Sequence, residues 1–192
     1  MKKKLIIFAS GSGSNAVNVC QNFKHHPEIE VVAIFCNKPN AGVIPKMMAL
    51  DIPVVIFNRE DFLQEDYFLS LLNKYNPTYI ALLGFLWKVP SFLVRTYPNK
   101  IVNLHPGLLP KFGGKGMYGH FVHEAVKAAG EGQTGITLHW VNEHYDEGNT
   151  IAQFSCDLLP SDTVENISEK IHELEQKFVP TVIEKIMNGE LS

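Results

Sequence analysis

The 192-residue chain lacks several features that mark specialised classes of protein. Its three cysteines, Cys20, Cys36 and Cys156, are scattered and odd in number, which argues against a disulfide framework or a structural zinc and suits a reducing cytoplasm. No apolar run approaches the roughly 20 residues that span a bilayer, and residues 5–9 are too few for a signal-peptide core. A net charge of -3 gives no broad basic surface, so we expect neither nucleic acid nor membrane as a partner.

Short β-rich apolar runs alternate with segments of helical apolar spacing. We expect strands at residues 5–9, 31–35, 54–57, 79–83 and 101–104, and helices at 16–23, 62–72 and 123–129. Continuous apolar strands separated by helices are typical of a parallel sheet that is covered on both faces. The pattern therefore predicts a doubly wound α/β domain with a mostly parallel sheet.

The last part of the chain is predicted to extend this sheet differently. Residues 137–141 and 150–154 are further strands, and the stretch "NEHYDEGN" between them is too short for a crossover helix. We therefore expect an antiparallel pair. A long final helix is predicted to start at Asp162 and Glu165 and to end before Gly189. Without linkers or repeats, we expect one domain over residues 1–192.

The first candidate site is "FASGSGSNA", residues 8–16, between the first strand and the first helix. Gly11 and Gly13 permit tight backbone conformations, and a helix start presents free N–H groups that bind phosphate. The string also matches a dinucleotide fingerprint, but an NAD site needs an acidic residue after the second strand, where the chain has "CNK" at 36–38. Phosphate alone is favoured; a plain turn in which Ser14 and Asn15 cap the helix remains an alternative.

The second candidate is "IVNLHPGLLPKFGGKGMYGH", residues 101–120, where a buried strand gives way to a glycine-rich loop. Asn103 and His105 are two residues apart, so both project to one side of the strand, at the sheet edge where ligands bind in open α/β folds. An amide beside an imidazole supplies hydrogen-bond donors for an oxyanion. A structural role for the histidine remains the alternative reading.

Asp146, in "EHYDEGN", is either a turn residue before Gly148 or an acidic partner that orients His105 and raises its pKa. On the strand before it, Thr137 and His139 share a face and are candidates for a supporting layer behind the site. The histidines match no zinc-ligand spacing, so we expect no metal.

Four stretches together resemble the phosphoribosylglycinamide formyltransferase family, and the resemblance extends over nearly the whole chain. They are "SGSGSN" at 10–15, "CNKPNA" at 36–41, "VNLHPGLLP" at 102–110 and "HYDEGNTIAQ" at 144–153. The resemblance implies a Rossmann-like formyltransferase fold and transfer of a formyl group from 10-formyltetrahydrofolate, a co-substrate, to the amine of glycinamide ribonucleotide in purine synthesis. Another folate-dependent formyltransferase or a formyltetrahydrofolate hydrolase is the alternative, as are a non-catalytic nucleotide-binding module and an NAD oxidoreductase.

The resemblance also implies a role for individual residues. It assigns catalysis to Asn103, His105 and Asp146, substrate phosphate to Gly13, Ser14 and Asn15, the ribosyl group to Glu175, and folate to Arg59, Leu86, Trp87, Lys88, Val89, Asn103, Val141 and Asn142. It places the phosphate-binding half at about residues 1–100 and the folate-binding and catalytic half at about 101–192. Small molecules are the expected partners, and the expected assembly is a monomer or a homodimer.

Two features depart from the family pattern. The chain has Leu86-Trp87 where the family often has Met-Arg, and its loop "KFGGKGMYGH" at 111–120 is longer and richer in glycine. We expect these departures to affect folate binding rather than the chemistry. The loop at 107–119 is a candidate lid, because glycines give it hinge freedom.

Overall fold

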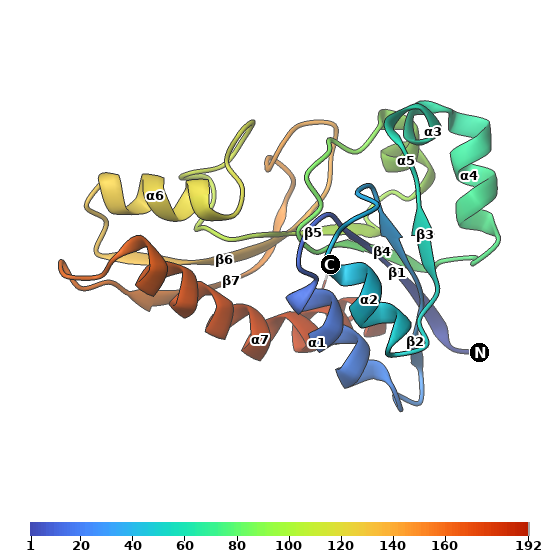
Figure 1. The fold of residues 1–192 in the computed structure, drawn as a ribbon, viewed down its shortest axis with the longest axis horizontal. Helices are drawn as coiled ribbons and strands as arrows, with labels where there is room; N and C mark the ends of the chain where they lie inside the picture. The colour runs from blue at the N-terminus through green and yellow to red at the C-terminus, as the bar shows by residue number, and fades with distance from the viewer. Residues whose placement is uncertain (192) are drawn as a thin grey trace.

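The structure, a computed structural model, describes residues 1–191 and contains one seven-stranded sheet (Figure 1). The strand order is β3-β2-β1-β4-β5-β6-β7. The strands are β1 (Lys3–Ala9), β2 (Ile29–Cys36), β3 (Val54–Ile56), β4 (Tyr79–Leu82), β5 (Ile101–His105), β6 (Gln133–Trp140) and β7 (Thr150–Asp157). Strands β1 to β5 are parallel, whereas β6 is antiparallel to β5 and β7 is antiparallel to β6. The predicted fold class and the antiparallel terminal pair are confirmed.

Helices cover both faces of the sheet. They are α1 (Ser14–Phe23), α2 (Val43–Met48), α3 (Arg59–Leu63), α4 (Glu65–Asn73), α5 (Ser91–Thr96), α6 (His120–Ala128) and α7 (Val164–Asn188). In Figure 1, α1, α2 and α7 lie on one side of the sheet, and α3, α4 and α5 lie on the other. Helix α6 packs against α7. The short helices α2 and α5 escape prediction because a single turn and a half carries too little apolar periodicity.

Three predicted helices differ from the structure, and the one expected at 123–129 begins at His120. The helix expected at 62–72 is interrupted at Gln64, whose extended backbone separates α3 from α4. The final helix starts after Thr163 rather than at Asp162, because the Thr163 hydroxyl accepts from the N–H of Asn166 in a capping box. The carboxylate of Asp162 instead accepts from the N–H of Leu159 over 2.9 Å.

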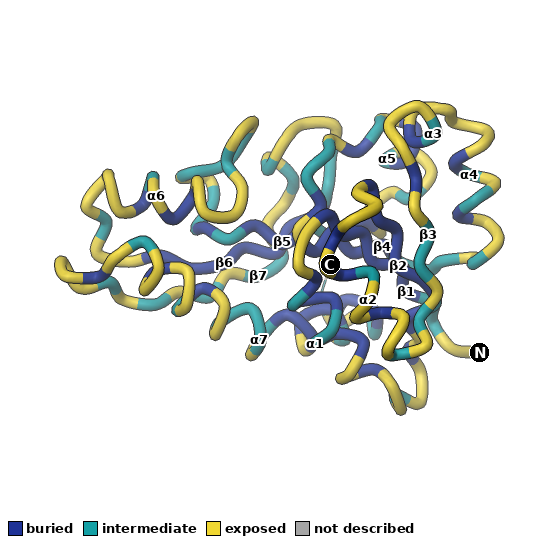
Figure 2. Tube along the Cα trace, viewed as in Figure 1, coloured by how far each residue is buried: buried dark blue, intermediate teal, exposed yellow. Residues whose placement is uncertain are grey.

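The central strands are buried over most of their length, as Figure 2 shows by their mainly dark blue colour. Strand β1 is apolar at every position from 5 to 9, with side chains at most 1% exposed, because helices exclude water from both of its faces. Edge strand β7 alternates instead between exposed and half-buried residues. The buried strands fix a rigid edge at their carboxyl ends, and the loops that leave this edge build the site.

Candidate active site

A cavity of about 670 Å³ opens at the carboxyl edge of the sheet. Its walls come from the β1–α1 loop, the β4–α5 loop, strand β5, the loop at 107–119, the β6–β7 loop and helix α7. The first two loops are joined, because the N–H of Ser10 donates to the carbonyl of Gly84 and the Ser10 hydroxyl accepts from the N–H of Leu86. A large, partly apolar cleft with a few convergent polar groups is the usual form of a small-molecule site.

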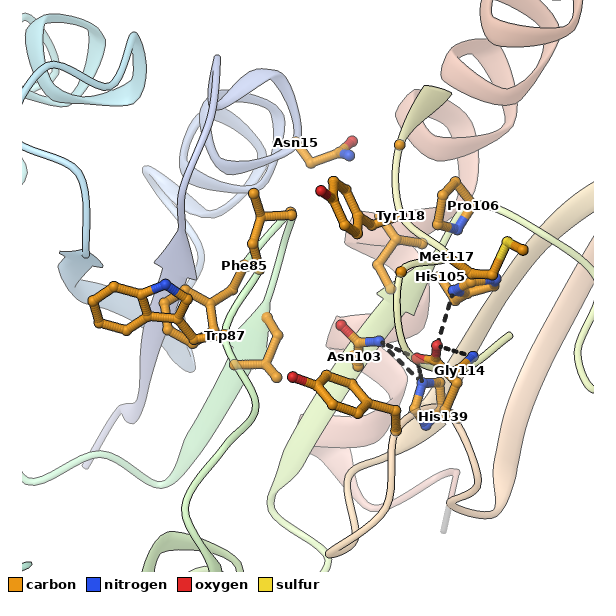
Figure 3. A pocket seen from close by; sticks show the side chains of 18 of the residues that line it. Asn15, Phe85, Trp87, Asn103, His105, Pro106, Gly114, Met117, Tyr118 and His139 are labelled. Carbon is orange, nitrogen blue, oxygen red and sulfur yellow. Dashed lines mark hydrogen bonds and ion pairs between the residues drawn. The ribbon is translucent and has the colours of Figure 1, made fainter. Parts of the chain in front are cut away.

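The three predicted catalytic residues line one wall of this cavity, and Figure 3 labels two of them, Asn103 and His105. Asn103 and His105 come from β5, and Asp146 comes from the β6–β7 loop. The Nδ2 of Asn103 donates to Oδ1 of Asp146 over 3.3 Å, and Nδ1 of His105 lies 3.6 Å from Oδ2 of Asp146. The fold therefore brings together an amide, an imidazole and a carboxylate that lie far apart in the sequence.

His139 fixes the orientation of the Asn103 amide. Its Nδ1 lies 2.9 Å from the carbonyl oxygen of Trp140, which can only accept, so Nδ1 carries the ring proton. In the neutral ring, Nε2 is then an acceptor and takes a hydrogen bond from Nδ2 of Asn103 over 3.0 Å. The predicted supporting position of His139 behind Asn103 follows from strand pairing, because the two residues are partners between β5 and β6.

The charge state of His105 is set by opposing effects. The ring is only 2% exposed, and burial lowers its pKa, although the facing Asp146 carboxylate and the carbonyl of Phe112 oppose part of this effect. The expected effect of Asp146 is present, because its carboxylate raises the pKa of His105, but burial has the larger and opposite effect. The Nε2 of His105 donates to the carbonyl of Phe112 over 3.0 Å, so the 107–119 loop occupies one of its two nitrogens.

Asp146 is held by a backbone N–H of the 107–119 loop and by neighbouring side chains. Burial raises its pKa, but neighbouring His139 and the N–H of Gly114, which donates to Oδ2 over 2.9 Å, outweigh burial and leave the pKa below its ordinary value. Asp146 itself has a φ of 55°, in the left-handed region that aspartate tolerates. A Cβ on Gly148 would overlap the carbonyl of Trp140, so this tight turn requires glycine.

Thr137 supports the glycine-rich loop rather than Asp146. Its hydroxyl donates to the carbonyl of Gly107 over 2.6 Å and accepts from the N–H of Leu109 over 3.1 Å. The Nε2 of Gln153 donates to the same hydroxyl over 2.9 Å. Thr137 does not line the cavity, so its predicted supporting role acts through the start of the 107–119 loop.

The predicted phosphate loop forms the opposite end of the cavity. Gly13 has a φ of 75° and precedes α1, and a Cβ there would overlap the side chain of Val43. Ser14 and Asn15 line the cavity, but neither caps the helix. Instead Nδ2 of Asn15 donates to Oε2 of Glu175 over 2.9 Å, which places the predicted ribosyl residue beside the phosphate loop.

The residues that the resemblance assigns to folate lie toward the third side of the cavity. Leu86, Trp87, Lys88, Val89, Val141 and Asn142 all line it. Trp87 packs edge-on against Phe57 and Phe85, which belong to an aromatic cluster under α3 and α4. Arg59 does not line the cavity; its guanidinium lies over the Trp87 ring at 5.8 Å. The predicted contact of Arg59 with folate therefore stays a prediction.

Sequence reasoning missed several groups in the cavity wall. The N–H of Gly114 and the carbonyl of Phe112 are backbone groups with no residue-type signal. His123 on α6 lines the cavity, is 5% exposed, and has a pKa lowered by burial and by neighbouring His120 and His105. His123 lies on α6, which begins at His120 rather than at the expected residue 123. A histidine on the buried face of this helix was the signal that could have identified it. Among residues 1–191, no cluster of three or more potential ligands is arranged for a metal ion.

None of the helices in residues 1–191 combines the length and apolarity that crossing a bilayer requires.

Comparison with known proteins identifies the family. The sequence profile of the family described as "Formyl transferase" matches residues 3–183. The phosphoribosylglycinamide formyltransferase of Bacillus subtilis is 34% identical, and the alignment covers 96% of this chain and 95% of that protein. The chloroplastic phosphoribosylglycinamide formyltransferase of Arabidopsis thaliana is 35% identical, but the chain spans only 64% of its length.

Solved structures give the same result. The glycinamide ribonucleotide transformylase 1 of Geobacillus kaustophilus superposes with a TM-score of 0.87 at 32% identity and covers 97% of this chain and 100% of its own. The phosphoribosylglycinamide formyltransferase of Streptococcus pneumoniae gives a TM-score of 0.84 at 30% identity, with 97% and 99% coverage. Given a profile match over almost its whole length and this cavity, the chain belongs to the formyl transferase family.

Proposed function

We propose that the chain transfers the formyl group of 10-formyltetrahydrofolate to the amine of N1-(5-phospho-D-ribosyl)glycinamide. The products are the formylglycinamide ribonucleotide and tetrahydrofolate, in de novo purine biosynthesis. One observation carries the proposal: Asn103, His105 and Asp146 converge in a cavity that has a phosphate-type loop at one end and an apolar, aromatic wall at the other. The names of the bacterial relatives that match over their full length support it.

In this reaction the amine nitrogen attacks the formyl carbon, and the carbonyl electrons move to oxygen. The tetrahedral intermediate then expels the folate nitrogen, which takes up a proton as the new amide loses one. Asn103 supplies a donor for the oxygen. Its N–H toward His139, at 3.0 Å, holds the amide in place, and the other N–H, whose 3.3 Å bond to Asp146 is the weaker one, is shared with the oxygen of the intermediate.

His105 acts on the same intermediate once the loop releases it. Its Nε2 is bonded to the carbonyl of Phe112 in the 107–119 loop. Movement of that loop upon substrate binding frees the N–H for the developing negative charge, which raises the proportion of protonated ring. This assigns the loop a lid function that also switches the partner of His105.

Asp146 stabilises protonated His105 and relays a proton between the two substrates. Its carboxylate, held ionised by Gly114 and the neighbouring imidazoles, stabilises the charged form of His105. From the cavity wall it accepts a proton from the attacking amine through water and returns it to the departing folate nitrogen. General acid–base help of this kind contributes about 10²- to 10⁴-fold to rate.

The two substrates occupy opposite ends of the cavity. Ser14 and Asn15, with the N–H groups that Gly13 exposes at the start of α1, bind the phosphate, and Glu175 binds the ribose hydroxyls. The pterin of the folate lies against Leu86, Trp87, Val89 and Val141, since flat aromatic ligands favour such walls. The co-substrate is a folate and no metal takes part in these roles.

The division into a phosphate-binding half and a folate-binding half stays a prediction. The residues assigned to each end of the cavity come from both halves of the chain, because Glu175 is assigned to the phosphate end and residues 86–89 to the folate end. We also propose a cytoplasmic protein, a monomer or homodimer, whose partners are small molecules rather than nucleic acid or membrane. Light scattering in solution tests the assembly.

A coupled absorbance assay for deformylated folate tests the activity. We expect product formation only when glycinamide ribonucleotide is present. Formate release at a similar rate without the ribonucleotide would instead identify a formyltetrahydrofolate hydrolase. Absence of both reactions, with folding confirmed by circular dichroism, would refute formyl transfer by this chain.

A further inference from the structure

The loop between β6 and β7 is fixed at its base and projects at its tip. At the base, the N–H of Trp140 donates to the carbonyl of Asn149 over 2.9 Å, so the two strands close the loop. Residues 143–145 at the tip are exposed, and Asp146 follows them directly. The position of the Asp146 carboxylate therefore depends on what holds this tip in place.

The ring of Tyr145, one residue before Asp146, lies against the opposite loop of the cavity. The Nζ of Lys88, in the β4–α5 loop, lies over this ring at 5.9 Å from its centroid, and both residues line the cavity. Strands β4 and β6 flank β5 in the sheet, so the contact reaches across β5, the strand that carries Asn103. An ammonium within about 6 Å of an aromatic centroid is attracted by the ring.

The Lys88 end of this contact is the rigid one. Its neighbour Trp87 packs edge-on against two phenylalanines of the aromatic cluster under α3 and α4. On the other side of Lys88, Val89 is buried in the same cluster. The backbone of Lys88 is thus held between two packed side chains, whereas Tyr145 belongs to an exposed tip. A contact with a fixed loop restricts the movement of such a tip.

We propose that the Lys88–Tyr145 contact positions Asp146 for catalysis by holding the tip of the β6–β7 loop at the catalytic wall. Tyr145 and Asp146 are consecutive, so the placement of the ring limits where the following carboxylate can lie. Asp146 keeps its bonds to Asn103 and to the N–H of Gly114 while the tip stays in place. Lys88 acts on the reaction through this loop, a role distinct from the folate contact that the resemblance assigns to it. The inference rests on the proposed function, because it concerns the rate of that reaction.

Steady-state kinetics of paired variants test the positioning. Lys88→Met removes the charge and Tyr145→Leu removes the ring, so each should lower kcat by about twofold to fivefold, the effect of an exposed cation–ring contact. The double variant should lose no more than either single variant, since both remove the same contact. Lys88→Arg and Tyr145→Phe keep a cation and a ring, so each should retain most of the turnover.

A matched control removes a similar contact elsewhere. The Nζ of Lys177 lies 5.0 Å from the ring centroid of Phe178 on α7, and neither residue lines the cavity. Lys177→Met should therefore keep the wild-type kcat.

An NMR titration of the His105 ring protons in the ligand-free protein shows whether Asp146 has moved. The Asp146 carboxylate raises the pKa of His105 against the effect of burial. Tyr145→Leu changes no charge, so a pKa of His105 that falls further below its ordinary value in this variant reports a displaced carboxylate. Tyr145→Phe should titrate as the wild type does.

Three results would overturn the inference and leave formyl transfer intact, with folding of each variant confirmed by circular dichroism. They are kcat losses that add in the double variant, a change confined to the KM for folate, and an unchanged His105 titration in Tyr145→Leu. Failure of the proposed function looks different, because the wild-type protein would then form no formylated product. The titration would still show whether the contact places Asp146.

Discussion

The catalytic wall around Asn103 and the phosphate end around Gly13 use different kinds of groups. At the catalytic wall, side chains from β5, β6 and the β6–β7 loop bond one another: Asn103 contacts both His139 and Asp146. At the phosphate end, the site is formed mainly by the backbone conformation at Gly13, and the side chain of Asn15 bonds Glu175 on α7. A substitution at the wall should therefore disturb several partners, whereas one at the phosphate end should act on a single contact or on the backbone.

The largest effect is expected for Asn103→Ala. The change removes a donor for the intermediate and leaves His139 and Asp146 without their shared partner, so kcat should fall by about 10²–10³, or roughly 3–4 kcal/mol. Steady-state kinetics measure the loss. Asn22→Ala, on the exposed face of α1, is the control, because its amide contacts only Asn18 of the same helix. Near-normal turnover in Asn103→Ala would exclude this residue from catalysis.

Asp146→Asn should come second, with a loss in kcat of about 10²-fold. The amide keeps the shape of the side chain but removes the charge that opposes the effect of burial on His105. The pKa of His105 should therefore fall further below its ordinary value, which an NMR titration of its ring protons measures. An unchanged or higher pKa in the variant would show that the carboxylate does not act on this imidazole.

Gly13→Ala tests the backbone design of the phosphate end. Its φ of 75° disfavours any Cβ, and that Cβ would overlap Val43, so we expect a loss of about 1–3 kcal/mol in the free energy of unfolding and a higher KM for the ribonucleotide. Gly11→Ala is the matched control in the same loop, because a Cβ there meets nothing within 4 Å. Equal urea midpoints for the two variants would contradict the proposed strain at Gly13.

The same contrast explains how much of the site was predictable. The loop at 10–15 and the alternation of strands and helices follow from local signals: glycines after an apolar strand, then helical spacing. The projection of Asn103 and His105 to the same side of β5 was also predictable from strand periodicity, since residues two apart share a face. These parts depend on interactions within a few residues, and the structure confirms their placement.

The remaining features depend on contacts between distant segments. The pairing of Asn103 with His139 requires the register between β5 and β6, which no local pattern specifies. The bond from His105 to Phe112 depends on a loop whose path is set by Thr137 and Gln153. The net direction of the His105 pKa could not be predicted for the same reason: it depends on burial by the completed fold, whereas the sequence indicated only the carboxylate that raises the pKa.

The smallest effect is expected for Glu175→Gln, which isolates the charge at the phosphate end. The folded-state pKa of Glu175 is raised by burial, so its contribution to stability is present below the ordinary glutamate value near pH 4.3 and is lost as pH rises through the folded pKa. Glutamine does not titrate, and its amide oxygen still accepts from Asn15. The stability of the variant relative to the wild type should therefore increase between about pH 4 and pH 7, by of the order of 1 kcal/mol. Urea unfolding at each pH measures this difference, and a difference that stays constant or decreases with pH would mean that the Glu175 carboxylate is not destabilised by burial, leaving a favourable ionic role at this end of the cavity.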